Sequence, residues 1–433
     1  MHPFVKRSYN AAGVLSRLAV SITPKGESKL LRTMSARRGL LERYEAWADD
    51  YRDDTRPLLW IHAPSVGEGL QALPVIQRIR DRRPDVQLAY TFFSPSAERF
   101  AATTGAAFSD YLPFDTASHM KRALDALRPT ALVYSKLDVW PLLTADAADR
   151  GTRLGLLSAT VPESSRRRSR LALLALGEAY AALDVVGAIS PSDAERLLEM
   201  GVPSDRITIT GDTRYDQVWG RATAPNTKRD ALIERYRDER KTLVAGSTWP
   251  SDEKPLLEAW NRVRQEIPGV RLIIAPHEVS PAHLANIDRW ARSSGLSVSR
   301  TSDADDGVSS DVLLIDGYGI LGDMYALADA AYVGGGFHAA GLHSLLEPAA
   351  FGAPVLFGPL HTDNRDARLL IGGGGAIRCP GTGDISARLR AWFTNEKVRA
   401  KAGQCARRVV EAGLGGADRS ADLIESLLTP GRG

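Results

Sequence analysis

One carboxylate follows an apolar segment early in the chain. Trp60-Ile61-His62-Ala63-Pro64 leads into Ser65-Val66-Gly67-Glu68-Gly69, where small residues permit a tight turn from a strand into a helix. Glu68 then lies near the helix N-terminus, where the helix dipole favours the ionised carboxylate and lowers its pKa. A carboxylate of ordinary pKa can still act as a general base when proton transfer comes late in bond formation. Two interpretations stay open for Glu68: a base that takes a proton from an incoming hydroxyl, or an acid that serves only the dipole.

Charged side chains also follow two later apolar segments. Lys136 and Asp138 come directly after Ala131–Ser135, and Pro141 is suited to begin a helix. Further along, four arginines occur within five positions: Arg166, Arg167, Arg168 and Arg170. Guanidinium groups bind phosphate oxygens in bidentate pairs, so this cluster is suited to a phosphorylated ligand. The alternatives are a surface ion pair between Lys136 and Asp138, and a solvated helix face for the arginines.

The second half of the chain offers a phosphate cradle. Gly246-Ser247-Thr248 lies between an apolar segment and Asp252-Glu253, so backbone amides and two hydroxyls are presented where a helix begins. This stretch lacks the lysine and the spacing of a P-loop, which disfavours nucleotide hydrolysis. After the next apolar segment, His277 can donate to a phosphate or cap its own loop.

A glycine-rich run extends from Tyr332 to Pro348. Its glycines let the backbone approach a ligand closely, Ser344 lies at a predicted helix start, and Glu347 is placed to accept hydrogen bonds from ribose hydroxyls. The run comes late in the chain and lacks the acid about 20 residues on that a dinucleotide motif requires. It indicates a nucleotide-binding surface of another kind.

Short apolar segments alternate with helical patterns and must position these residues. The first series is Leu58–His62, Val86–Phe93, Ala131–Ser135, Arg153–Ser158, Asp184–Ile189 and Arg206–Thr210. After a hinge-like stretch at Trp219–Thr227, the second is Thr242–Ala245, Arg271–Ala275, Val312–Ile315, Ala330–Val333, Pro354–Phe357 and Ala376–Cys379. This rhythm is typical of βαβ units in a parallel sheet with helices on both faces. We predict an α/β chain of two doubly wound, Rossmann-like domains facing a central cleft, with ligands at the strands' carboxyl ends.

Composition sets the broader limits. The 433 residues, 44% of them hydrophobic and 25% charged, favour two or three domains with large cores. Cys379 and Cys405 share no metal-ligand spacing, so we expect neither a zinc site nor a disulfide framework, and a reducing compartment fits best. No apolar run approaches the roughly 20 residues that cross a bilayer. Residues 4–22 alternate basic and apolar groups, which predicts either an interfacial membrane helix or an amphipathic helix packed on its own domain.

A known family carries the same motifs in the same order. The landmarks, between about Trp60 and Ala376, are Ser65-Val66-Gly67-Glu68, Trp140-Pro141, Gly211-Asp212-Thr213-Arg214-Tyr215-Asp216, Gly246-Ser247-Thr248, Pro276-His277-Glu278, Gly319-Ile320-Leu321, Gly334-Gly335-Gly336 and His343-Ser344-Leu345-Leu346-Glu347-Pro348-Ala349-Ala350. The chain resembles the Kdo transferases of lipopolysaccharide synthesis, which are inverting glycosyltransferases of the GT-B fold. They move 3-deoxy-D-manno-octulosonic acid (Kdo) from CMP-Kdo to a lipid A precursor.

The resemblance implies a role for each candidate residue, with Glu68 as the catalytic base. The implied donor-binding residues are Arg214, Gly246, Ser247, Thr248, His277, Gly319, Ile320, Leu321, Gly335, Gly336, Ser344 and Glu347. The expected acceptor-binding residues are Ser65, Gly67, Lys136, Asp138, Arg166, Arg167, Arg168 and Arg170. No Asp-x-Asp metal motif stands at a strand end, so we expect neither a metal nor another cofactor.

The resemblance also implies partners, a location and a division of the chain. The partners would be CMP-Kdo, a lipid A precursor and the cytoplasmic face of the inner membrane, which favours the interfacial interpretation of residues 4–22; nucleic acid is not expected. The predicted parts are residues 1–40 as a membrane-associating segment, 41–215 for the acceptor, 216–405 for CMP-Kdo, and 406–433 as a C-terminal helix that crosses back to the first domain.

The chain departs from the commoner family pattern at two places. Lys136 and Asp138 stand where many members have two glutamates, which puts in doubt a second carboxylate at position 136. Pro276-His277 likewise lacks the arginine of the commoner Pro-Arg-His. Two other functions are therefore considered: a different sugar-nucleotide enzyme, such as a UDP-sugar transferase or epimerase, or a catalytically lapsed member that binds nucleotide or lipid.

Overall fold

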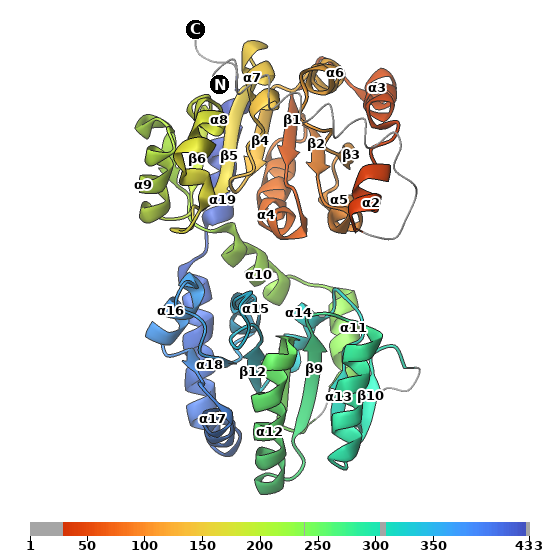
Figure 1. The fold of residues 1–433 in the computed structure, drawn as a ribbon, viewed down its shortest axis with the longest axis vertical. Helices are drawn as coiled ribbons and strands as arrows, with labels where there is room; N and C mark the ends of the chain where they lie inside the picture. Colours follow the sequence, from red (N-terminus) through yellow and green to blue (C-terminus); the bar gives the residue numbers. More distant parts are fainter. Residues whose placement is uncertain (1–28, 238, 304–308, 430–433) are drawn as a thin grey trace. The chain divides into compact units, whose positions relative to one another are not determined.

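The computed structural model describes residues 29–237, 239–303 and 309–429. The chain forms two compact units: unit 1 contains the residues up to Gln217 and from Leu414 onward, and unit 2 is Val218–Gly413. Each unit is built around one parallel seven-stranded sheet with helices on both faces (Figure 1). The predicted α/β fold of two doubly wound domains, the GT-B architecture, is confirmed.

Unit 1 has the strand order β3-β2-β1-β4-β5-β6-β7. Its strands are β1 (Leu58–His62), β2 (Gln87–Phe92), β3 (Phe108–Tyr111), β4 (Ala131–Ser135), β5 (Arg153–Ala159), β6 (Val185–Ala188) and β7 (Ile207–Ile209). Its helices are α2 (Lys29–Ser35), α3 (Leu40–Tyr51), α4 (Val66–Arg82), α5 (Glu98–Ala101), α6 (Ala117–Leu127), α7 (Pro141–Asp149), α8 (Arg170–Ala181), α9 (Pro191–Glu199) and α19 (Gly416–Leu428). Every residue of β1, β2 and β4 is buried, as expected of central parallel strands.

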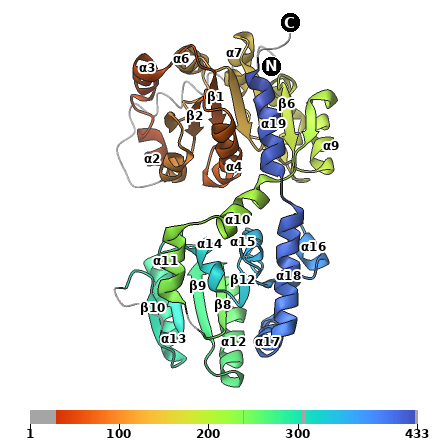
Figure 2. The same cartoon turned by 180° about the vertical axis from the view of Figure 1, so that it is seen from behind.

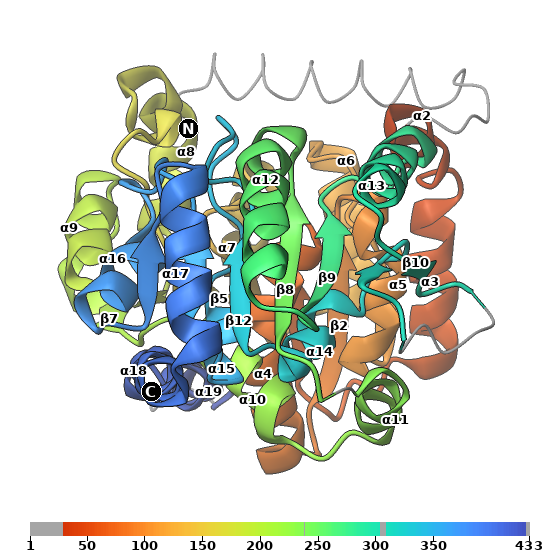
Figure 3. The same ribbon diagram turned by 90° about the horizontal axis from the view of Figure 1, so that it is seen from below.

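Unit 2 repeats this plan with the order β10-β11-β9-β8-β12-β13-β14. Its strands are β8 (Thr242–Thr248), β9 (Arg271–Pro276), β10 (Val298–Arg300), β11 (Val312–Leu314), β12 (Ala330–Val333), β13 (Val355–Phe357) and β14 (Ala376–Arg378). Its helices are α11 (Thr227–Tyr236), α12 (Pro250–Glu266), α13 (Pro281–Ser293), α14 (Leu321–Met324), α15 (Leu346–Ala350), α16 (Arg365–Gly372), α17 (Thr382–Thr394) and α18 (Glu396–Ala412). Helices α12, α13 and α17 pack on one face of this sheet, and α11 and α14 pack on the other (Figure 3).

The last helix, α19, packs within unit 1. It contacts α4 and β5 and lies beside α4 (Figure 2). Asp216, at the start of α10 (Thr213–Thr223), accepts hydrogen bonds from the N–H groups of Gly415 and Ala417, both at 2.9 Å. Because these amides are among those that a helix start leaves without internal partners, Asp216 fixes where α19 begins.

Two strands are missing from the sequence-based prediction. They are β3 and β10, which lie at the edges of their sheets and include partly exposed residues. Their short sequences, Phe108–Tyr111 and Val298–Arg300, contain polar residues and lack the continuous apolar run by which the central strands are recognised. The membrane-associating segment predicted at residues 4–22 lies outside the described residues. Among the residues that the structure describes, none of the helices is both long and apolar enough to span a membrane.

Candidate active site

Glu68 lies in the first turn of α4, directly after the carboxyl end of β1. The Ser65 hydroxyl donates to Glu68 Oε2, and Lys136 Nζ donates to Glu68 Oε1 at 3.1 Å. Burial raises the pKa of Glu68, but the hydrogen bond from Ser65 and the positive charge of Lys136 outweigh it, so the pKa lies below its ordinary value. Glu68 is therefore ionised at neutral pH. Each of its oxygens has one donor and keeps a further lone pair for a ligand.

Lys136 reaches Glu68 from the neighbouring strand. Strand β4 pairs with β1, and Lys136 follows it with a left-handed φ of 62°. Such a conformation is uncommon for a residue with a side chain. The alternative interpretation, an ion pair between Lys136 and Asp138, is wrong, because the two side chains have different partners. Lys136 is instead the counter-ion of Glu68.

Asp138 is the centre of a second polar cluster. Its carboxylate accepts from Arg167 at 3.0 Å and from the Trp140 indole N–H at 3.1 Å, and His62 Nε2 lies 3.5 Å away. Burial raises the pKa of Asp138, but His62 and Arg167 lower it by more, so the pKa of Asp138 lies below its ordinary value and the carboxylate is ionised. Thr91 Oγ1 accepts from the Trp60 indole, which can only donate, and lies 3.0 Å from His62 Nδ1.

The other predicted acceptor residues contribute unequally. Arg167 alone among the four arginines contacts the cluster, donating also to the carbonyl of Leu137. Arg168 pairs with Glu199 at 2.5 Å, while Arg166 and Arg170 are exposed. Gly67 lies in open space, since a Cβ there would meet only the Ser65 hydroxyl, at 3.8 Å. The structure therefore brings Ser65, Lys136, Asp138 and Arg167 to the carboxyl ends of the central strands, where Glu68 lies.

In unit 2 the predicted phosphate cradle belongs to a strand rather than to a loop. Strand β8 continues through Gly246 and Ser247 to Thr248, and its register with β9 shifts across these residues. Ser247 has a φ of 53°, so the strand bends at a β-bulge. The Thr248 hydroxyl is buried and donates to Glu253 at 2.8 Å.

Three glycines let backbone segments meet closely beside this bulge. A Cβ on Gly334 would lie 2.1 Å from the Ser247 carbonyl oxygen, one on Gly335 would lie 2.0 Å from that of Gly341, and one on Gly336 would lie 2.3 Å from the amide nitrogen of Gly358. The sequence predicted close approach to a ligand at Gly335 and Gly336. The structure shows that packing of backbone against backbone already requires glycine there.

A buried carboxylate that the sequence analysis did not single out holds this loop. Asp252, fully buried in the first turn of α12, accepts from the N–H groups of Gly335 at 2.8 Å and Phe337 at 3.0 Å. It also accepts from Trp249 N–H at 3.1 Å and from the Tyr332 hydroxyl at 3.2 Å. Asp252 thus ties the start of α12 to the end of β12.

Four aromatic rings stack beside Asp252. Trp249 stacks on His338 at 4.1 Å between ring centroids and on His277 at 4.4 Å, and His277 stacks on His343 at 4.3 Å. Burial and the neighbouring His277 lower the pKa of His343 to about 4. Its Nε2 accepts from the Trp249 indole at 3.2 Å, as a neutral imidazole can.

Glu347 lies in another part of unit 2, after the glycine-rich run. It is half-buried in the first turn of α15, and its carboxylate has no hydrogen bond to any other described residue. Burial raises its pKa above the ordinary value, although the charge of Arg221 opposes this. Arg221 pairs with Asp323 at 2.8 Å and donates to the Gly319 carbonyl at 2.9 Å, beside the predicted Ile320 and Leu321. A ligand hydroxyl could satisfy Glu347.

Arg214 and Ser344 complete the set of predicted donor-binding residues. Arg214 belongs to unit 1 and pairs with Asp212 at 2.7 Å. Ser344 is exposed and precedes α15 by two residues. Within the described parts of the chain, no group of three or more His, Cys, Asp or Glu side chains could hold a metal ion, and metal-independent chemistry stays a prediction.

Comparison with known proteins gives consistent matches over most of the chain. The family model described as 3-deoxy-D-manno-octulosonic-acid transferase (kdotransferase) matches residues 33–217. A 3-deoxy-D-manno-octulosonic acid transferase of Bordetella pertussis is 30% identical, with 86% of this chain and 87% of that protein covered. One of Haemophilus influenzae is 26% identical over the same shares. Among solved structures, the UDP-GlcNAc 2-epimerase of Neisseria meningitidis bound to UDP-GlcNAc has a TM-score of 0.61 and 13% identity, covering 86% of this chain and 99% of that one. That likeness concerns the fold.

Proposed function

Because this chain belongs to the 3-deoxy-D-manno-octulosonic acid (Kdo) transferase family and is a glycosyltransferase of lipopolysaccharide biosynthesis, we propose that it transfers Kdo from CMP-Kdo to a lipid A precursor, with Glu68 as the general base. The observation that carries the proposal is the ionised Glu68 carboxylate. It is held at the carboxyl end of β1 by Ser65 and Lys136 and keeps lone pairs for an acceptor hydroxyl.

The reaction is a single displacement. An acceptor hydroxyl hydrogen-bonds to Glu68 and attacks the anomeric carbon of Kdo; the bond from that carbon to the CMP phosphate oxygen breaks, and configuration inverts. The hydroxyl proton passes to Glu68 late in this step, as a base of lowered pKa requires. CMP takes the bonding electron pair and leaves with its phosphate.

Unit 2 would bind the nucleotide of the donor. Glu347, whose carboxylate makes no hydrogen bond to another described residue, would accept from the ribose hydroxyls. The backbone around Ser247 and the ring stack of Trp249 and His277 would lie near the phosphate and the sugar. The developing charge on CMP is that of one phosphate, which backbone dipoles and cationic groups can stabilise.

The acceptor and the place of action extend this proposal. Asp138, Arg167 and Lys136 would position the acceptor, with the exposed Arg166 and Arg170 available to its phosphates. We propose that the enzyme acts on this lipid acceptor at the cytoplasmic face of the inner membrane, as a peripheral or monotopic protein. We propose that it uses neither a metal nor another cofactor, so EDTA should leave the rate unchanged.

The test is transfer by the purified protein. Incubation with CMP-Kdo and a lipid A precursor, followed by mass spectrometry, should show acceptor that has gained Kdo. Glu68→Gln should lower the transfer rate at least about 100-fold, while CMP binding measured by calorimetry changes by less than about twofold. No gain of Kdo mass would favour a lapsed binding protein. Thermal protection by UDP but not by CMP would point to another sugar-nucleotide enzyme.

A further inference from the structure

The sugar that this family transfers carries a charge of its own. Kdo is a 2-keto acid, so its carboxyl group is bonded directly to the anomeric carbon and is ionised at neutral pH. The carbon at which the new bond forms therefore arrives with a carboxylate beside it. A site that transfers this sugar needs a partner for that carboxylate, because an anion without one is costly away from water.

The reaction brings the sugar carboxylate close to Glu68. An acceptor hydroxyl held by Glu68 lies about 2.6–3.2 Å from a carboxylate oxygen, and about 3–3.5 Å from the anomeric carbon as the attack begins. After one more carbon–carbon bond, the carboxyl group of the sugar is within roughly 8 Å of Glu68. Both groups are anions, and their repulsion in a partly buried site opposes this approach. A cation that contacts both of them would remove the repulsion.

Lys136 is a cation that already contacts Glu68. Its Nζ donates to Glu68 Oε1 at 3.1 Å, and 34% of its side chain is exposed. An ammonium group has three N–H donors. Among residues 29–237, 239–303 and 309–429, Glu68 is the only hydrogen-bond partner of Nζ. Two donors of Lys136 are therefore available to a ligand while the contact with Glu68 is kept.

The backbone at position 136 supports a role for this side chain. Lys136 follows β4 with a left-handed φ of 62°, and its N–H donates to the Leu157 carbonyl in β5 at 2.9 Å. Glycine adopts this conformation without strain, whereas a residue with a Cβ adopts it at a cost. Strained residues of this kind cluster at active sites and at ligand-binding segments. The backbone thus agrees with a lysine that binds a ligand.

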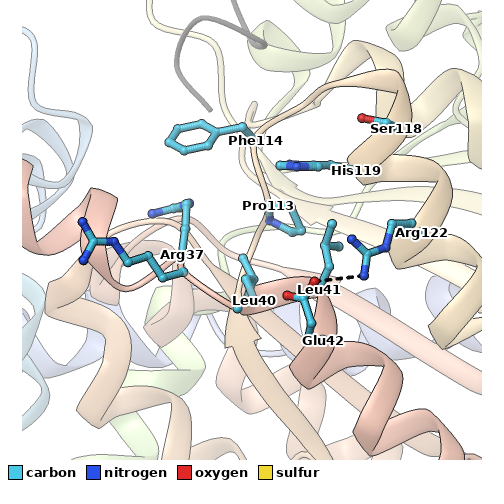
Figure 4. A pocket seen from close by; sticks show the side chains of 11 residues that line it. Arg37, Leu40, Leu41, Glu42, Pro113, Phe114, Ser118, His119 and Arg122 are labelled. Atoms are coloured by element: carbon cyan, nitrogen blue, oxygen red, sulfur yellow. Dashed lines mark hydrogen bonds and ion pairs between the residues drawn. The ribbon is translucent and has the colours of Figure 1, made fainter. Parts of the chain in front are cut away.

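Two other cationic side chains of unit 1 are held by groups of the protein. Arg37 and Arg122 line a cavity beside the carboxyl end of β3 (Figure 4). Arg37 donates to three backbone carbonyls, and Arg122 pairs with Glu42 at 3.2 Å, the contact that the dashed line in Figure 4 marks. Lys136 differs from both, because its protein partner is the proposed base.

We propose that Lys136 binds the carboxylate of the transferred sugar while it keeps its hydrogen bond to Glu68, and that this contact makes the enzyme selective for a donor with a carboxylate on its anomeric carbon. The proposal rests on the proposed role of Glu68, since the reacting hydroxyl is held there. The family resemblance implies a glutamate at position 136, so the contact is a property of this chain and not of the family. A neutral sugar cannot make it.

The test compares two donors in matched proteins. The donors are CMP-Kdo and its C1 carboxamide, which has nearly the same shape and no charge at that group. The proteins are wild type and Lys136→Met, which keeps a side chain of similar length without the charge. Lys121→Met is the control, because it makes the same change on α6 at an exposed lysine paired with Asp125 at 2.7 Å. An effect that acts through Glu68 changes kcat/KM for both donors by the same factor, so the ratio of the two values reports the carboxylate contact.

We expect Lys136→Met to reduce the preference for CMP-Kdo over the carboxamide at least about fivefold in kcat/KM, as loss of a charge-assisted hydrogen bond requires. Lys136→Arg should keep most of the preference, and Lys121→Met should leave it within about twofold of wild type. Lys136→Gly suits the left-handed backbone and provides a second variant without the charge, which should behave as Lys136→Met does. A smaller reduction, or an equal loss of kcat/KM with both donors, would overturn the proposal.

Binding separates this proposal from the proposed function. Calorimetry with the two donors needs no transfer, and the preference of wild type for CMP-Kdo should again fall at least about fivefold in Lys136→Met. If neither donor is transferred but calorimetry shows this fall, the sugar contact stands and the catalytic assignment of Glu68 is wrong. If transfer occurs and depends on Glu68, but the preference does not respond to Lys136→Met, the base stands and the sugar contact is wrong. If there is neither transfer nor a fall in preference, both are wrong.

Discussion

Replacing Asp252 by asparagine should destabilise unit 2 and weaken nucleotide binding together. One carboxylate oxygen accepts from the N–H groups of Trp249 and Gly335, and the other from Phe337 N–H and the Tyr332 hydroxyl. The amide NH₂ of asparagine must replace one oxygen. Even in the better orientation, Phe337 N–H then faces a donor, whereas the Tyr332 hydroxyl can rotate to accept.

The size of the effect follows from this count. One buried N–H without an acceptor costs about 1–3 kcal/mol, and each of the two bonds kept by the amide oxygen loses roughly 1 kcal/mol when its acceptor is no longer charged. Relief of the buried charge offsets part of this loss. We therefore expect Asp252→Asn to lower the free energy of unfolding by about 2 kcal/mol or more.

Urea denaturation measures this loss, and calorimetry with CMP measures the accompanying effect on the site. CMP should bind at least about tenfold more weakly, because the loop from Gly334 to Phe337 is no longer held to α12. Glu258→Gln is the control: it makes the same acid-to-amide change on α12, at an exposed side chain paired with Arg262, and should cost less than about 0.5 kcal/mol. If Asp252→Asn unfolds within about 0.5 kcal/mol of wild type and binds CMP normally, Asp252 does not organise this loop.

Two further predictions concern pH. Lys136→Met removes a charge that lowers the pKa of Glu68, so this pKa should rise. Because the base form of Glu68 is lost as pH falls through its pKa, the acid limb of the pH–rate profile for transfer should move to higher pH. An unmoved acid limb would show that Lys136 does not set the pKa of the catalytic base. His343 has a folded-state pKa of about 4 against an ordinary 6.5, so the unfolded chain binds the proton first and stability falls as pH drops from about 6.5 toward 4. Urea denaturation at about pH 7 and about pH 5 should show a smaller loss for His343→Phe than for wild type, and equal losses would contradict the assignment.

The central part of each sheet was predictable because burial on both faces leaves a continuous apolar run. The predicted segments Leu58–His62 and Ala131–Ser135 coincide with β1 and β4. The edge strands β3 and β10 were not predictable in this way, because β3 contains the exposed Ser109 and all three residues of β10 are only partly buried, so neither forms a continuous apolar run. The extension of β8 to Thr248 could not be predicted for another reason. Its bulge requires a left-handed backbone at Ser247, and a serine gives no indication of that conformation in the sequence.

Whether the contacts of the site could be predicted also depends on how far apart the contacting residues lie in the sequence. Ser65 and Glu68 share one helical turn, so their contact lies within reach of the sequence. Asp252 meets Gly335 and Phe337 more than 80 positions away, which no local pattern encodes. The same holds for Arg37, whose carbonyl partners include Leu112, 75 positions further on. Such residues meet at the carboxyl ends of neighbouring parallel strands, and which strands are neighbours can be stated only when the strand order is known.

Position 136 shows what the strand order changes. From the sequence, Lys136 counts as the loss of a second carboxylate that the family resemblance implies at this position. In the structure, β4 lies next to β1, which brings Lys136 Nζ to 3.1 Å from Glu68. The lysine then acts on the proposed base itself: together with the hydrogen bond from Ser65, its charge lowers the pKa of Glu68 against a burial that raises it. The departure from the commoner pattern is thus compatible with catalysis, and its effect should appear in the pH dependence of transfer rather than in its absence.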